Sequence, residues 1–149
     1  MPPASTAFVL DQATLWIGDG QSVDGHVIVR DGILESVAPG RYTGDLPRIA
    51  LGGAAVSPGL VDIMLCGGFN LSLLHDDPVA IARHYLSLGV TTCQITTGTL
   101  TDDHMVQFCE KAAVAMAYEG LDASWITGVY FEGPFYDPAC IGGNNAELV

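Results

Sequence analysis

Alternating strand and helix patterns in the second half of the chain are the feature that most limits its fold. Residues 60–65, 90–97 and 125–131 are short apolar or β-branched runs, which predict buried strands. Two segments with helical spacing lie between them, one opening at Asp77 and ending at Gly89, the other opening at Thr101 and ending before Gly120. The order strand, helix, strand, helix, strand predicts a parallel sheet with right-handed crossovers.

The residues at which the two predicted helices begin support this prediction. Asp77 followed by a proline is typical of an N-cap and first turn, and Thr101 is a suitable N-cap for the second helix. The acidic pairs 76–77 and 102–103 each open a helix, where negative charge is favoured by the helix dipole. We therefore interpret them as capping residues rather than as paired catalytic carboxylates.

The N-terminal third has a different pattern. Residues 7–51 contain short β-type runs at 8–10, 13–17, 26–30 and 33–37, and the pair Asp31-Gly32 is a strong hairpin signal. This predicts a small β unit, with a domain boundary near Ser57. We expect two domains, residues 1–56 and residues 57–149.

Composition limits the partners of the chain. Hydrophobic residues make up 49% and charged residues only 15%, which leaves little polar surface for a free-standing domain and favours a partner surface. A formal charge of −12 with five Lys and Arg argues against nucleic acid or membrane as the main partner. The N-terminus has no secretory signal and no apolar run is long enough to span a bilayer, so a cytoplasmic protein is expected. The four cysteines form no C-x-x-C pair and are interpreted as buried free thiols.

A carboxylate stands at the end of the third predicted strand. The segment Phe131-Glu132-Gly133-Pro134-Phe135 follows the apolar run, and Gly-Pro stops the strand. In α/β barrels the chemistry is carried at the carboxyl ends of the strands. Glu132 is therefore a candidate site residue, with an ordinary solvent-facing glutamate as the alternative.

Four segments together carry a family resemblance: 27–37, 56–63, 89–92, and 131–135 with Gly142-Gly143-Asn144-Asn145 downstream. On these segments the chain resembles the N-terminal part of an N-acetylglucosamine-6-phosphate deacetylase of the amidohydrolase superfamily, and the Glu-Gly-Pro-Phe segment narrows the resemblance to this deacetylase. The matched part is less than half of the usual family length. The implied fold is α/β: a small β-sandwich-like unit, part of a composite sandwich, followed by the first three strands and two helices of an incomplete TIM (β/α)8 barrel.

The resemblance implies a metal-assisted hydrolysis of an amino-sugar phosphate, which yields glucosamine 6-phosphate and acetate. One divalent ion, zinc or a similar ion, would polarise the acetamide and activate water. Glu132 matches the metal ligand of the family, and Gly142, Gly143 and Asn144 match a substrate-binding loop. The two histidine ligands and the aspartate base would lie beyond Val149, so no catalytic residue is expected within the chain. The histidines at 26, 75, 84 and 104 match no ligand position.

Two positions depart from the family pattern. Met64-Leu65-Cys66 stands where relatives carry His-x-His or Gln-x-Asn, and packing is the preferred interpretation of both sulfur side chains. Asn144 replaces a histidine, and an asparagine can donate a hydrogen bond to an oxyanion but cannot take a proton.

Three hypotheses follow. In the first, the chain is an N-terminal fragment of the deacetylase, inactive without its missing C-terminal half. In the second, it is a non-catalytic half-barrel that binds or oligomerises, as a homodimer with a second copy. The third, a dihydroorotase or hydantoinase relative, ranks last because those enzymes rely on the His-x-His pair.

Overall fold

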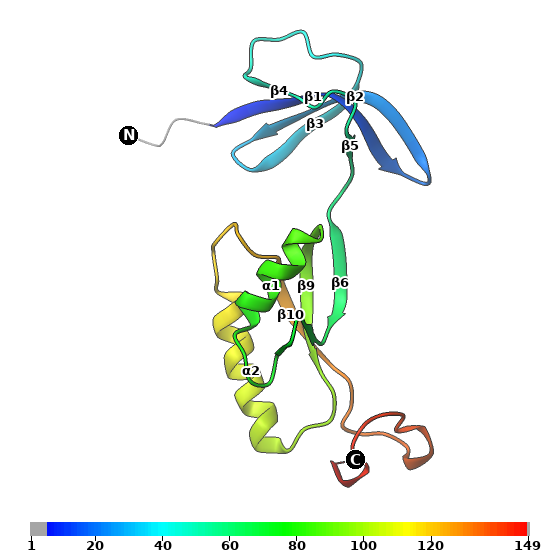
Figure 1. Ribbon diagram of the computed structural model, residues 1–149, viewed down its shortest axis with the longest axis vertical. Helices are drawn as coiled ribbons and strands as arrows, with labels where there is room; N and C mark the ends of the chain where they lie inside the picture. Colours follow the sequence, from blue (N-terminus) through cyan, green and yellow to red (C-terminus); the bar gives the residue numbers. More distant parts are fainter. Residues whose placement is uncertain (1–5, 149) are drawn as a thin grey trace. The chain divides into compact units, whose positions relative to one another are not determined.

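A computed structural model of the chain describes residues 6–148 and contains two compact units, the first ending at Pro58 and the second beginning at Gly59 (Figure 1). The first unit is a five-stranded sheet of β1 (Ala7–Gly18), β2 (Gln21–Arg30), β3 (Ile33–Pro39), β4 (Arg48–Ala50) and β5 (Ala55–Val56). β2 is antiparallel to β1 and β3, whereas β4 and β5 run parallel to β1. Ala13, Leu15 and Val27 form its buried core.

The hairpin prediction for this unit is confirmed, and one strand prediction is wrong. Asp31 and Gly32 both have positive φ, 51° and 79°, as a type I′ turn requires. The predicted strands 8–10 and 13–17 are instead the single strand β1, which contains a bulge between Leu10 and Ala13. Gln12 takes a φ of 59° in this bulge. The strand therefore continues through the polar pair Asp11-Gln12, which in the sequence alone indicates the end of a strand.

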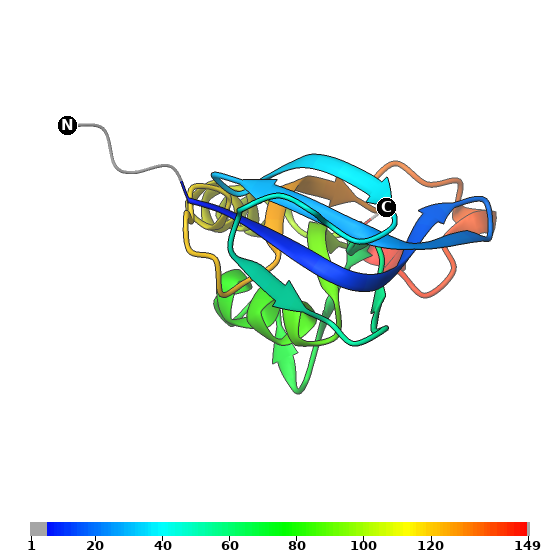
Figure 2. The same cartoon turned by 90° about the horizontal axis from the view of Figure 1, so that it is seen from above.

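The second unit is the predicted α/β arrangement. β6 (Leu60–Leu65), β9 (Val90–Thr97) and β10 (Trp125–Phe131) form a parallel sheet in the order β10-β9-β6, with a short hairpin of β7 (Gly67–Gly68) and β8 (Leu71–Ser72) after β6. The connections are α1 (Pro78–Ser87) and α2 (Asp102–Met116). One core cluster joins residues of both helices and all three strands, so α1 and α2 cover the same face of the sheet (Figure 2).

Both helix starts agree with the sequence. The Asp77 carboxylate accepts a hydrogen bond from the Val79 backbone N at 3.0 Å, and the Thr101 hydroxyl accepts one from the His104 backbone N at 3.4 Å. α2 ends at Met116, before Gly120 as predicted, and the chain that follows is bound to α1. There the guanidinium of Arg83 donates to the Tyr118 hydroxyl at 3.0 Å and to the Asp122 carboxylate at 2.8 Å.

The cysteine prediction needs correction. Cys93 is fully buried, but Cys66, Cys109 and Cys140 are exposed free thiols. Cys109 lies outside the α2 stripe of Phe108, Ala112 and Ala115 that faces the core, because consecutive helical residues point in different directions.

Within residues 6–148, no helix combines the length and apolar character that crossing a bilayer requires.

The buried thiol of Cys93 generates a pH prediction. Burial, with a smaller contribution from the charge of Asp62, raises its pKa from 9.0 to about 11. At a pH between these two pKa values, the unfolded chain has lost the thiol proton while the folded chain retains it. The free energy of unfolding therefore falls as pH rises through this range. We expect Cys93→Ala to remove roughly 2 to 3 kcal/mol of this pH-dependent loss. Urea unfolding from pH 7 to 11 measures it.

Cys109→Ala, at an exposed thiol, is the matched control and should keep the slope of the unmodified chain. Equal slopes for the unmodified chain and Cys93→Ala would contradict the prediction.

Candidate functional site

The two faces of the parallel sheet carry different side chains. Cys93 and Ile95 of β9 belong to the core under the helices, so alternation places Gln94 and Thr96 on the opposite face. On β10 the Phe131 ring lies 6.3 Å from the ring of Phe108 in α2, which assigns Phe131 to the helix side.

The residues on either side of Phe131, Tyr130 and Glu132, therefore lie on the same face as Thr96, the register partner of Tyr130. We call this face, with Gln94, Thr96, Gly128, Tyr130 and Glu132, the second face. A Cβ added at Gly128 would meet the Gln94 side chain at 3.7 Å, which agrees with this assignment.

Glu132 is held where the sequence places it, directly after β10. Its backbone N–H donates to the carbonyl of Thr97 at 3.0 Å, which extends the pairing with β9 by one residue. The side chain is half-buried. Gly133 then turns the chain with a φ of 100°, and a side chain there would collide with the Tyr136 ring and the Thr99 methyl group. The backbone of Glu132 is thus fixed by strand pairing on one side and by a glycine turn on the other.

Two neutral acids lie within the electrostatic reach of Glu132. Burial raises the pKa of the Cys66 thiol, and the charges of Glu132 and Asp62 raise it further. The pKa of Tyr136 is likewise raised by burial and by Glu132. Both groups are therefore protonated at neutral pH. Tyr136 carried no signal in the sequence, because only the folded loop brings it back to Glu132.

Of the predicted substrate loop, only Asn144 makes side-chain contacts. Its Oδ1 accepts from the Thr99 backbone N at 3.2 Å and from the Thr99 hydroxyl at 3.5 Å, while its Nδ2 donates to the Ile141 carbonyl at 3.3 Å. Gly142 and Gly143 are exposed, and a Cβ at either would meet nothing within 4 Å. Substrate binding by these two glycines stays a prediction.

A buried hydroxyl on the second face has no partner. Thr96 is 2% exposed, and its Oγ1 makes no hydrogen bond within the described structure. Such an atom costs free energy unless a further group reaches it. It lies on β9 opposite Tyr130, which precedes Glu132 by two residues.

The described residues do not fit a metal ion by themselves. Zinc takes four ligands in structural sites and three protein ligands in catalytic ones. Among residues 6–148, no three His, Cys, Asp or Glu side chains come close enough to share an ion. His26 contacts the Gly40 carbonyl at 2.9 Å, His84 stacks on Phe69, and His104 lies in the first turn of α2. Metal binding by Glu132 stays a prediction.

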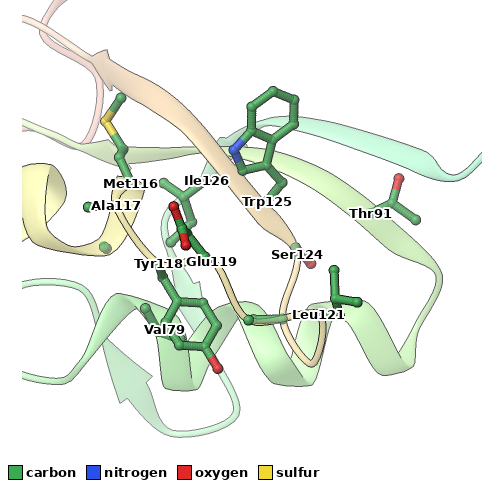
Figure 3. Close-up of a pocket in the computed structure, with 13 residues that line it drawn as sticks. Val79, Thr91, Met116, Ala117, Tyr118, Glu119, Leu121, Ser124, Trp125 and Ile126 are labelled. Carbon is green, nitrogen blue, oxygen red and sulfur yellow. The ribbon is translucent and has the colours of Figure 1, made fainter. Parts of the chain in front are cut away.

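A cavity of the second unit lies away from Glu132. It encloses about 510 Å³ beside Trp125 and Ile126, which begin β10, whereas Glu132 follows the end of that strand (Figure 3). Its ionisable lining groups are Tyr118 and Glu119, and the Tyr118 hydroxyl is bound to Arg83 and Asp122. This cavity does not contain the predicted site.

The electrostatic effect of Glu132 on Cys66 generates a prediction. Glu132→Gln removes a negative charge that disfavours the thiolate, so the pKa of Cys66 should fall and its alkylation by iodoacetamide at a fixed, mildly alkaline pH should become faster. Peptide mass spectrometry separates Cys66 from the other thiols.

Glu147→Gln, at an exposed carboxylate in the C-terminal 3₁₀ turn, is the control and should leave Cys66 unchanged. An unchanged or slower alkylation rate in Glu132→Gln would show that the two side chains are not neighbours.

Comparison with known proteins finds deacetylases that are similar to this chain. No protein-family model matches the chain. A curated N-acetylglucosamine-6-phosphate deacetylase from Vibrio furnissii is 30% identical over 95 residues, which cover 59% of this chain and 23% of the relative. The solved deacetylase from Thermotoga maritima has a TM-score of 0.75 at 22% identity, over 94% of this chain and 36% of that one.

A Mycobacterium smegmatis deacetylase variant, solved in complex with N-acetyl-D-glucosamine-6-phosphate, has a TM-score of 0.75 at 24% identity, over 97% of this chain and 36% of that one. The chain therefore spans about a third of the solved structures and less than a quarter of the curated relative. In sequence and in fold, it is similar to the N-terminal portion of N-acetylglucosamine-6-phosphate deacetylases.

Proposed function

We propose that this chain forms the N-terminal part of a metal-dependent N-acetylglucosamine-6-phosphate deacetylase, which hydrolyses the acetamide to glucosamine 6-phosphate and acetate in amino-sugar catabolism. The observation that carries the proposal is the position of Glu132, on the second face at the carboxyl end of the third parallel strand. Catalytic groups of α/β barrels are found at that end of the strands. A cytoplasmic location fits a sugar-phosphate substrate.

The fold proposal is that residues 57–149 begin a (β/α)8 barrel and that residues 1–56 contribute to a composite β-sandwich. Parallel sheets are normally covered on both faces. Val61 and Ile63 of β6 are 65% and 64% exposed, and Trp125 of β10 is 65% exposed, which is more apolar surface than a finished parallel sheet presents. Further strands of the barrel would cover these side chains.

The metal proposal follows from the ligand count. A divalent ion, zinc or a similar one, would receive one carboxylate from Glu132 and its remaining ligands, two histidines, from the C-terminal half, which would also supply the aspartate base. The chain alone then binds no catalytic ion. Its own contribution is a single carboxylate, Glu132, whose charge raises the pKa of Cys66 and of Tyr136, so that neither of these side chains competes with it as an anion. Gly142 and Gly143 would let the backbone approach the substrate.

An alternative function is a non-catalytic half-barrel that pairs with a second copy. Its support is Met64 and Cys66, which stand where relatives carry metal-binding side chains, together with the exposed apolar residues of β6 and β10. In that case the uncovered sheet would be buried in a homodimer.

The test is a deacetylation assay on the product of the complete reading frame that encodes this chain. We expect release of glucosamine 6-phosphate from N-acetylglucosamine 6-phosphate, and a loss of at least about 100-fold in kcat/KM for Glu132→Gln, because a metal ligand is lost. Glu147→Gln should keep full activity.

The chain of residues 1–149 by itself should be inactive and should contain negligible zinc by elemental analysis. Full activity in Glu132→Gln would refute the proposed role of this residue. An inactive, zinc-free product that sediments as a stable dimer would instead support the half-barrel alternative.

A further inference from the structure

We propose that Asn144 is a positioning residue, whose carboxamide fastens the loop after Glu132 to the end of β9 and so keeps the Glu132 carboxylate on the second face. This differs from the substrate contact that the family pattern suggests for this position. The hydrogen bonds of Asn144 lie within this chain and do not depend on the proposed deacetylase function. Only the importance of Asn144 for catalysis rests on that function.

The carboxamide is already engaged on both sides. Its oxygen accepts two hydrogen bonds from Thr99, at 3.2 Å from the backbone N and 3.5 Å from the hydroxyl, and its nitrogen donates to the Ile141 carbonyl at 3.3 Å. Thr99 is 8% exposed, so water does not readily replace these bonds. An oxygen that serves two buried donors is not available to a ligand.

The loop is attached to one short segment at both of its ends. Where it leaves the sheet, the Glu132 backbone N–H binds the Thr97 carbonyl, and where it returns, Asn144 binds Thr99. Fixing both ends of a loop limits the conformations that its first residues can take. The attachment of Asn144 therefore limits the conformations of residues 133–143, which connect it to Glu132.

Two glycines make room for this attachment. A Cβ at Gly98 would lie 2.6 Å from the Asn144 oxygen, closer than a real contact allows. A Cβ at Gly133 would collide with the Tyr136 ring and the Thr99 methyl group. Hydrogen bonding with Asn144 also counteracts the rise in the pKa of Tyr136 that burial and Glu132 cause.

The test uses two independent readouts on the full chain. The first is hydrogen exchange of the Thr99 backbone amide, the donor to Asn144. We expect Asn144→Ala to accelerate this exchange about 10-fold, the loss of one net hydrogen bond of about 1.4 kcal/mol. Asn144→Asp keeps an acceptor oxygen and should restore protection. Asn145→Ala is the matched control, because the Asn145 side-chain oxygen accepts a local bond from the Glu147 backbone N at 3.0 Å.

The second readout is the pH dependence of Cys66 alkylation, which reports whether the Glu132 charge is still beside the thiol. We expect Asn144→Ala to lower the pKa of Cys66, as Glu132→Gln does, and Asn145→Ala to leave it unchanged. The Ile95 amide, in the middle of β9, confirms that each variant is folded.

Unchanged Thr99 exchange in Asn144→Ala would overturn the attachment. Faster Thr99 exchange with an unchanged Cys66 pKa would overturn the positioning of Glu132. Neither readout uses deacetylase activity. The proposed function is tested separately by the activity of Glu132→Gln, so its failure is distinguishable from failure of this inference.

Discussion

The register of β10 against β9 is the constraint on which the site depends. Tyr130 pairs with Thr96 and Phe131 with Thr97, and a shift by one residue would turn every side chain to the other face. Glu132 would then point toward α2, and Phe131 would leave its contact with Phe108. A bulge between Ile126 and Gly128 sets this register: Ile126 and Val129 both pack on the helix side although they are three residues apart. The Thr127 hydroxyl donates to the Cys93 carbonyl at 3.2 Å and stabilises the bulge.

A similar irregularity on β6 brings the other site position into place. Asp62 pairs with Cys93 and Leu65 with Ile95, so one extra residue is accommodated between them, and the Asp62 carboxylate accepts from the Met64 backbone N at 2.9 Å. Leu65 is thereby buried in the helix-side core, and Cys66 follows on the other side, within the field of Glu132. Both outer strands of the sheet therefore deviate so that their last residues, Leu65 and Phe131, face the helices, and the residues that follow them, Cys66 and Glu132, lie on the second face.

Much of the fold follows from local chemistry that the sequence displays. The strand and helix alternation, the caps at Asp77 and Thr101 and the Asp31-Gly32 turn are each decided within a few residues, and Glu132 is recognisable because its strand ends in Gly-Pro. The bulges around Gln12 and Thr127, the exposure of Cys66 and the loop attachment of Asn144 are not visible in that way. Each depends on a partner distant in sequence, such as Thr99 for Asn144, and hydrophobic periodicity carries no information about such contacts.

The central claim is that the β10 register puts Glu132 on the face opposite the helices. Nuclear Overhauser contacts of the neighbouring aromatic rings test it most directly, since Tyr130 and Phe131 lie on opposite faces. The account predicts contacts between the Tyr130 ring and the Thr96 side chain, and between the Phe131 and Phe108 rings. Contacts of Tyr130 with Phe108 and of Phe131 with Thr96 would show the register shifted by one residue and would contradict the account.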